Sequence, residues 1–147
     1  MTFAKSRDKI IDLLEASTPT TSVAGSGSSF KFIDAGETDR LGRTRSFFIA
    51  LRSGSIGGVL TSMTRIYVVD LDVSVFYRNV RSQKQMDEIM ISDYEVLTES
   101  LINNTQWDFS TTGLRRVTVA GENILNFEID EDENGVIMTI TVQMEYE

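Results

Sequence analysis

Carboxylates are the side chains in this sequence whose type and spacing could do chemistry. Asp70 and Asp72 alternate along one predicted strand, and Glu128 and Asp130 alternate along another. Alternate residues of a strand point to the same face of a sheet, so each pair presents two carboxylates together. Carboxylate oxygens suit hard divalent cations and general acid–base catalysis. One alternative is therefore a divalent-metal site built on Asp70 and Asp72 with Glu128 or Asp130.

The residue types that are missing exclude most other chemistry. The 147-residue chain contains no histidine and no cysteine. Ser-His-Asp and Cys-His catalytic pairs, structural zinc and iron–sulfur sites and disulfides are therefore excluded. The glycine- and serine-rich segment 25–29 lacks the Gly-Lys-Ser/Thr ending of a phosphate-binding loop. We expect no catalytic residue, no bound metal and no cofactor, and we expect that the chain is not an enzyme.

Hydrophobic periodicity predicts two helices and six strands. One helix is expected to run from about Thr2 to Ala16, and a second from Ser82 to about Asn103. The strands are expected at residues 30–34, 45–52, 65–78, 114–120, 123–130 and 136–146. The strand 65–78 is expected to be about 43 Å long, at ~3.3 Å per residue, and to project beyond the body or run the full length of the sheet.

The order and one-sidedness of these elements predict the fold class. The predicted order is a helix, three strands, a helix and three more strands. This order favours an α+β two-layer sandwich. We expect one domain spanning residues 1–147, with a mostly antiparallel sheet of five to six strands and two helices packed on one face. In the second helix, acidic residues are expected to face water: Asp87, Glu88, Asp93, Glu95 and Glu99.

The sheet face turned away from the helices is expected to be polar and acidic. If the apolar faces of all strands pack under the helices, the other face carries the following carboxylates: Asp70, Asp72, Glu128, Asp130 and Glu145. Arg52 and Arg116 are the candidate bases beside them. Such a face is either an ordinary solvated surface, the metal site named above, or an acidic wall that lines a shared channel and repels the DNA backbone.

Charge is divided unevenly along the chain. Residues 1–84 contain 12 Lys/Arg against 8 Asp/Glu, whereas residues 85–147 contain 2 against 14, within a net charge of −8. Copies that met head to tail would pair the basic half with the acidic half, although a solvated acidic surface explains the division as well. A net acidic protein is poorly suited to grip nucleic acid by its phosphates. No apolar run approaches the length that spans a membrane.

Two long loops and an acidic turn are the candidate assembly contacts. The loops are expected at 35–44 and 53–64, and the turn at 130–135. As an alternative, they are simply the mobile tips of hairpins. The candidate contact residues are Asp39, Arg40, Arg43, Ile56, Leu60, Asp132 and Glu133.

The layout resembles the tail terminator (minor tail protein U-like) proteins of long-tailed bacteriophages, small α+β proteins of similar length. The resemblance is carried by Ile10–Leu14 in the first helix, by the strand Tyr67–Tyr77 followed by Met86–Leu101, and by the closing strand Thr139–Tyr146. It implies a homohexameric ring that caps the tail tube, ends its polymerisation and joins it to the head connector. The implied partners are further copies of the chain, the major tail tube protein and a head completion protein.

The same resemblance implies a place and a relation to DNA. The ring would sit at the head-proximal end of the tail in the virion, after assembly in the host cytoplasm, and DNA would pass through its lumen only in transit. Other neck or tail-completion adaptors share this general build. A small ligand- or peptide-binding domain is a second class, and an enzyme that uses Asp70, Asp72 and Glu128 is a third. Metal-dependent activity lost on Asp70→Asn would be the mark of that third class.

Overall fold

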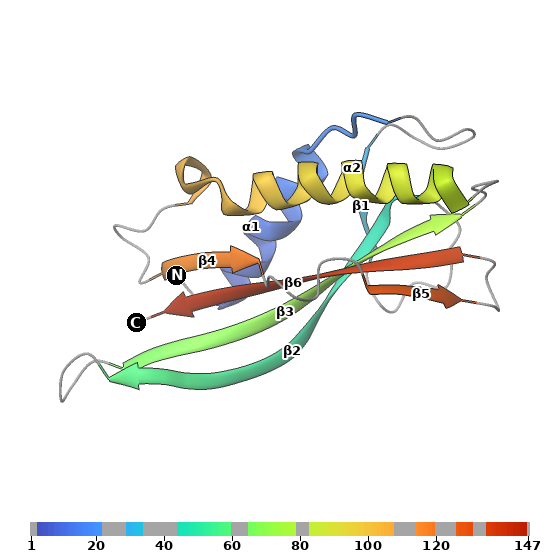
Figure 1. Ribbon diagram of the computed structural model, residues 1–147. Helices are drawn as coiled ribbons and strands as arrows, with labels where there is room; N and C mark the ends of the chain where they lie inside the picture. Colours follow the sequence, from blue (N-terminus) through green and yellow to red (C-terminus); the bar gives the residue numbers. More distant parts are fainter. Residues whose placement is uncertain are drawn as a thin grey trace.

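The computed structural model describes residues 3–21, 29–33, 44–59, 65–78, 83–107, 114–119, 126–130 and 135–146 (Figure 1). Its elements are, in order, α1 (Phe3–Ala16), β1 (Lys31–Phe32), β2 (Ser46–Val59), β3 (Arg65–Arg78), α2 (Gln83–Ile102), the short 3-10 helix η2 (Asn104–Gln106), β4 (Leu114–Val119), β5 (Asn126–Asp130) and β6 (Gly135–Tyr146). The predicted order of helix, three strands, helix, three strands is confirmed. The predicted α+β class is confirmed with it.

The strands form one sheet that is antiparallel except at one edge. The strand order is β1-β2-β3-β6-β4, and β5 also pairs with β6. β1 runs parallel to β2, while every other pairing is antiparallel. β6 has β3 along one side, and on its other side β5 pairs with its first half and β4 with its second half. β3 and β6 are thus the central strands, which accounts for their nearly unbroken alternation of apolar residues.

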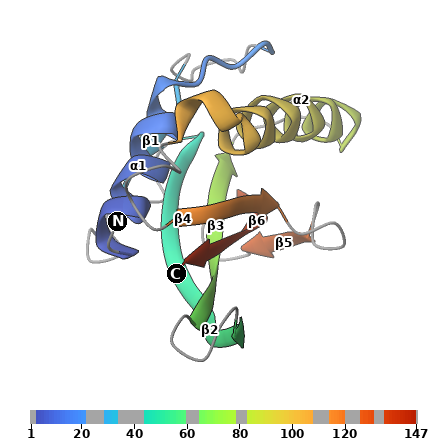
Figure 2. The same cartoon turned by 90° about the vertical axis from the view of Figure 1, so that its left-hand side faces the viewer.

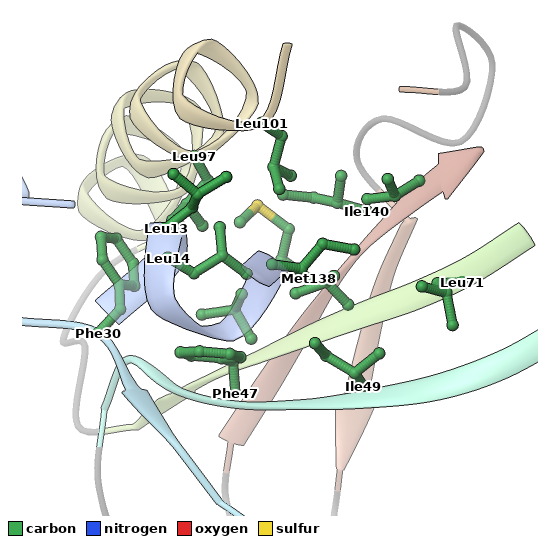
Figure 3. Packing of buried hydrophobic residues seen from close by; sticks show 14 of the residues in the cluster. Leu13, Leu14, Phe30, Phe47, Ile49, Leu71, Leu97, Leu101, Met138 and Ile140 are labelled. Carbon is green, nitrogen blue, oxygen red and sulfur yellow. The ribbon is translucent and has the colours of Figure 1, made fainter. Parts of the chain in front are cut away.

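Both helices cover the same face of this sheet, and the hydrophobic core lies between them and the strands (Figure 1). Figure 3 shows Leu14 of α1 and Leu97 and Leu101 of α2 directed towards Met138 and Ile140 of β6. All five side chains are fully buried. Burial of each such side chain contributes about 1.5–3 kcal/mol relative to exposure, so this layer is the main source of stability.

The C-terminal end of each helix is tied down by a specific hydrogen bond. The Ser17 hydroxyl, one residue past α1, donates to the Leu13 carbonyl at 2.9 Å and lies 2.8 Å from the Ser100 hydroxyl of α2. The Trp107 Nε1 donates to the Leu101 carbonyl at 2.8 Å. The bonds to Leu13 and Leu101 satisfy carbonyl groups that have no partner within the helix, and the contact between Ser17 and Ser100 joins α1 to α2.

β2 and β3 extend together past the helices as a projecting hairpin, at the lower left of Figure 1 and the bottom of Figure 2. β3 has the predicted bounds, and the prediction that it projects beyond the body is confirmed. β2 is longer than predicted, because residues 53–59 belong to the strand and not to the predicted loop 53–64. The pairing of β2 with β3 shifts its register twice, and each shift leaves one residue of β2 without a partner position on β3: Arg52 and Gly57. We call residues 51–59 and 65–70 the arm.

Candidate functional site

The sheet face opposite the helices brings together carboxylates that are distant in sequence. Asp70 and Asp72 of β3 lie opposite Gln143 and Thr141 of β6. Glu145 follows on the same face of β6 two residues beyond Gln143. The structure therefore places these three predicted residues on one surface, which we call the second face.

The two remaining predicted carboxylates lie in β5 at the edge of the sheet. The register pairs Glu128 with Ile137 and Asp130 with Gly135. Ile137 is opposite Phe76 and four residues from Thr141, so these positions are at the other end of the second face from Asp70. Asp70, Asp72 and Glu145 form one group, and the β5 positions are separate from it.

Both aspartates of the second face are held by donors from neighbouring strands. The Thr141 hydroxyl donates to Asp72 at 2.8 Å and accepts from Arg52 Nη1 at 3.1 Å. The same Arg52 nitrogen lies 3.8 Å from the Asp72 carboxylate. Asp70 accepts from Gln143 Nε2 and from the Ser53 hydroxyl, each at 3.1 Å. Both Asp70 oxygens and one Asp72 oxygen thus accept cross-strand hydrogen bonds, which form a ladder.

This ladder bears on the metal-site alternative. In the described part of the chain, no group of three or more carboxylates could hold a metal ion. A cation at Asp70 and Asp72 would compete with the donors Gln143, Thr141 and Ser53 for these carboxylates. The arrangement holds a fixed negative charge at a partly exposed surface.

The second face is not polar along its whole length, contrary to the expectation from strand alternation. Phe76 lies on this face opposite Ser46, and both residues are buried. Ile33, just past β1, is also buried, yet neither Ile33 nor Phe76 belongs to the main core cluster. The Ser46 hydroxyl is buried and has no hydrogen-bond partner among the described residues. The second face is therefore apolar and buried at Phe76, while Asp70, Asp72 and Glu145 are grouped near the arm.

A buried ion pair links the start of β2 to the middle of α2. Arg45 Nε and Nη2 donate to the two carboxylate oxygens of Asp93 at 2.8 and 2.9 Å, and the Tyr77 hydroxyl donates to the same carboxylate at 2.8 Å. Arg45 Nη2 also donates to the Thr21 carbonyl. Arg45 and Asp93 are almost completely buried. The prediction that Asp93 faces water is therefore wrong.

The local backbone explains how Arg45 reaches this position. Arg45 has a φ of 67°, in the left-handed region that a residue with a side chain rarely adopts. Its amide donates to the Phe76 carbonyl at 2.7 Å, and its carbonyl accepts from Lys31 at 3.1 Å. Its guanidinium lies 5.8 Å from the centre of the Phe30 ring. The turn before β2 is thus held by both the backbone and the side chain of one residue, which offsets the conformational strain.

The buried cluster of Arg45, Tyr77 and Asp93 makes the stability of the fold decrease at alkaline pH. Burial raises the pKa of the Tyr77 hydroxyl well above its ordinary 10.0, and the Asp93 carboxylate raises it further. Burial also raises the pKa of Asp93, and the hydrogen bonds from Arg45 and Tyr77 oppose that rise. Since unfolded Tyr77 releases its proton at lower pH than folded Tyr77, its contribution to stability is complete below pH ~10 and is lost as pH rises further.

We therefore expect the urea concentration at half-unfolding to fall between pH ~10 and ~11, and to fall less steeply in Tyr77→Phe. The variant is less stable than the parent at pH 8, because it leaves Asp93 with one donor fewer, but its pH slope is smaller. Urea titrations at several pH values measure both quantities. Parallel slopes for the parent and the variant would contradict the assignment.

Most of the predicted contact residues lie outside the described residues. These are Asp39, Arg40, Arg43, Leu60, Asp132 and Glu133. Ile56 is the exception: it lies within β2 opposite Tyr67, and so it is part of the arm and not of a loop. The prediction of a loop at Ile56 is wrong because β3 pairs with β2 along its full length.

Sequence reasoning missed the buried Arg45–Asp93 pair. Arg45 was expected to begin a strand and Asp93 to lie on the wet side of α2. The available signal was that Asp93 falls one turn after Ile89 and one before Leu97, two residues of the buried stripe. A carboxylate at a buried helical position requires a cation or several donors.

No model of a known protein family matches the chain, and no curated protein matches its sequence. None of the helices in the described ranges is both long and apolar enough to span a membrane.

Proposed function

We propose that the chain is a structural subunit that assembles into a ring and caps a bacteriophage tail tube, where it ends polymerisation and joins the tube to the head connector. The observation that carries this proposal is the arm. A hairpin that projects past the body with exposed apolar side chains is a candidate contact surface, since exposed apolar area favours association. Leu51 and Tyr67 are such side chains, 64% and 45% exposed.

The edge of β2 supports a role in ending a polymer. In the described part of the sheet, β2 is paired on its outer side only at Ser46 and Phe47, with β1. The rest of that edge contains the extra residues Arg52 and Gly57. Bulges and charges on an edge strand hinder the addition of another strand. A terminator must likewise bind the finished tube and offer no edge to the next subunit.

The acidic end of the second face supports a lumen. Asp70, Asp72 and Glu145 are only partly buried, so their charge is felt at the surface. A wall of fixed negative charge repels phosphates and keeps passing DNA from binding. In this proposal the second face lines the channel, and the arm and the helices make contacts with neighbouring subunits and with the tube.

The experiment that tests this proposal is the native mass in solution by light scattering, over a range of concentrations and with and without magnesium. One chain has a mass of 16.5 kDa, so a ring of six is expected near about 99 kDa. Electron microscopy should show a central channel, and the purified protein should stop elongation of tubes of the major tail tube protein. A monomer under every condition that also fails to bind tube ends would contradict the proposal.

A further inference from the structure

Four large apolar side chains are exposed in the described part of the chain, and they form two pairs. Leu51 and Tyr67 lie by register on the same side of the sheet as the buried Leu71, yet both are exposed, and Ile91 and Ile102 are exposed on α2. The two pairs are on different parts of the molecule. A contact that covers both pairs at once is one in which the arm of one copy lies against α2 of another.

The spacing within the two pairs is similar. Ile91 and Ile102 are separated by 11 residues, which is about three helical turns, so they lie on one side of α2 roughly 16 Å apart. On the arm, Leu51 is opposite Leu71, and Tyr67 is four residues further along β3. At about 3.3 Å per residue and about 4.8 Å between strands, Leu51 and Tyr67 are roughly 14 Å apart. The two apolar anchors on each surface can therefore meet in register.

The charges around the two pairs are opposite. Residues 51–69 include Arg52 and Arg65 and no Asp or Glu, and Asp70, the last residue of the arm, is turned to the second face, where it accepts from Gln143 and Ser53. The Arg52 side chain is 48% exposed although it contacts the second face. The outer side of α2 exposes three carboxylates that flank its isoleucines: Glu88, Glu95 and Glu99. A basic arm against an acidic helix is favoured, whereas two arms together would repel each other.

We propose that the arm of one copy packs on the outer side of α2 of the next copy, with Leu51 and Tyr67 against Ile91 and Ile102. The contact is head to tail, because each copy contributes a different surface to each of its two neighbours. Repetition of such a contact closes into a ring when the rotation between copies allows it. The identification of this contact as the joint of a ring rests on the function proposed above.

The chain contains no cysteine, so engineered cysteines can map this contact directly. One chain carries Leu51→Cys or Tyr67→Cys, and a second, of different tagged length, carries Ile91→Cys or Ile102→Cys. Mild oxidation of each arm–helix mixture should give a mixed dimer for at least one of the four combinations. A chain with Leu51→Cys alone should give none. A chain that combines an arm cysteine and a helix cysteine should give a ladder of cross-linked oligomers, and the largest oligomer should contain as many chains as the ring.

Charge reversal provides an independent measurement. Arg65→Glu should raise the concentration of half-assembly by about tenfold, and Glu95→Lys in the same chain should restore it in part. Glu15→Lys, an exposed site on α1 with the same change of charge as Glu95→Lys, is the matched control and should not restore assembly. Circular dichroism confirms that each variant remains folded.

The outcomes separate this inference from the proposed function. Assembly in solution without any arm–helix cross-link, or cross-links between two arm cysteines, would overturn the arm–helix contact and leave the ring. Arm–helix cross-links in an open, unbounded ladder would support the contact and contradict the ring. A chain that is monomeric, forms no cross-link at any concentration and also fails to bind tube ends would overturn both.

Discussion

Replacement of Arg45 by Met is expected to lower the free energy of unfolding by about 3–5 kcal/mol, which is a large part of the stability of an ordinary domain. The substitution removes both guanidinium donors from Asp93 and leaves a buried carboxylate with the Tyr77 hydroxyl as its remaining side-chain donor. A buried charge without its partner retains the full penalty of leaving water. The turn before β2 also loses the side chain that holds its left-handed backbone.

A surface pair of the same type provides the matched control. Arg52 and Asp72 are partly exposed, and their closest atoms are 3.8 Å apart. Arg52→Met is therefore expected to lower stability by about 0–1 kcal/mol. Urea unfolding followed by circular dichroism measures both variants. Similar losses for Arg45→Met and Arg52→Met would show that burial does not make the Arg45–Asp93 pair special.

A double substitution separates the pair from its environment. Arg45→Met with Asp93→Leu removes both charges and leaves apolar groups of similar size. Replacement of a whole buried pair in this way is often neutral or stabilising. We expect the double variant to be more stable than Arg45→Met alone. If it is less stable than either single variant, then the ion pair is required to specify the packing of β2 against α2.

Replacement of Leu101 by Ala is expected to lower the free energy of unfolding by about 2–5 kcal/mol. Leu101 is fully buried at the end of α2 and points into the core layer of Figure 3. Its carbonyl also accepts the Trp107 bond, so the helix end is held in place and cannot move inward to fill the cavity. The loss is the transfer free energy of the removed atoms together with the cavity that remains.

The next residue in the chain supplies the control. Ile102 is 50% exposed, so Ile102→Ala is expected to change the stability of the dilute monomer by less than about 1 kcal/mol. The same variant is expected to weaken assembly, because Ile102 is one of the two α2 anchors. Chemical unfolding at low concentration and light scattering at high concentration distinguish the two effects. A stability loss in Ile102→Ala as large as that in Leu101→Ala would contradict the observed burial.

Local pattern determined much of the fold. The alternation of apolar residues in Arg65–Arg78 gave both ends of β3, and the closing strand was placed within one residue. The helices agree with their predicted ranges to within one or two residues. These features depend on the period of side chains along a strand or helix, which is a property of neighbouring residues. The order of elements then restricts the fold to an α+β sandwich.

Tertiary structure decided the features that depend on distant partners. Residues 53–59 are rich in glycine and serine, and their composition predicts a loop. They form a strand because β3 supplies a pairing partner both before and after the bulge at Gly57. Asp93 reads as a solvent-facing residue of an acidic helix, yet it is buried because Arg45, 48 positions earlier, reaches it from another element. Charge type and local period do not encode such pairs. They arise only when the packed chain brings a donor to an acceptor that burial has removed from water.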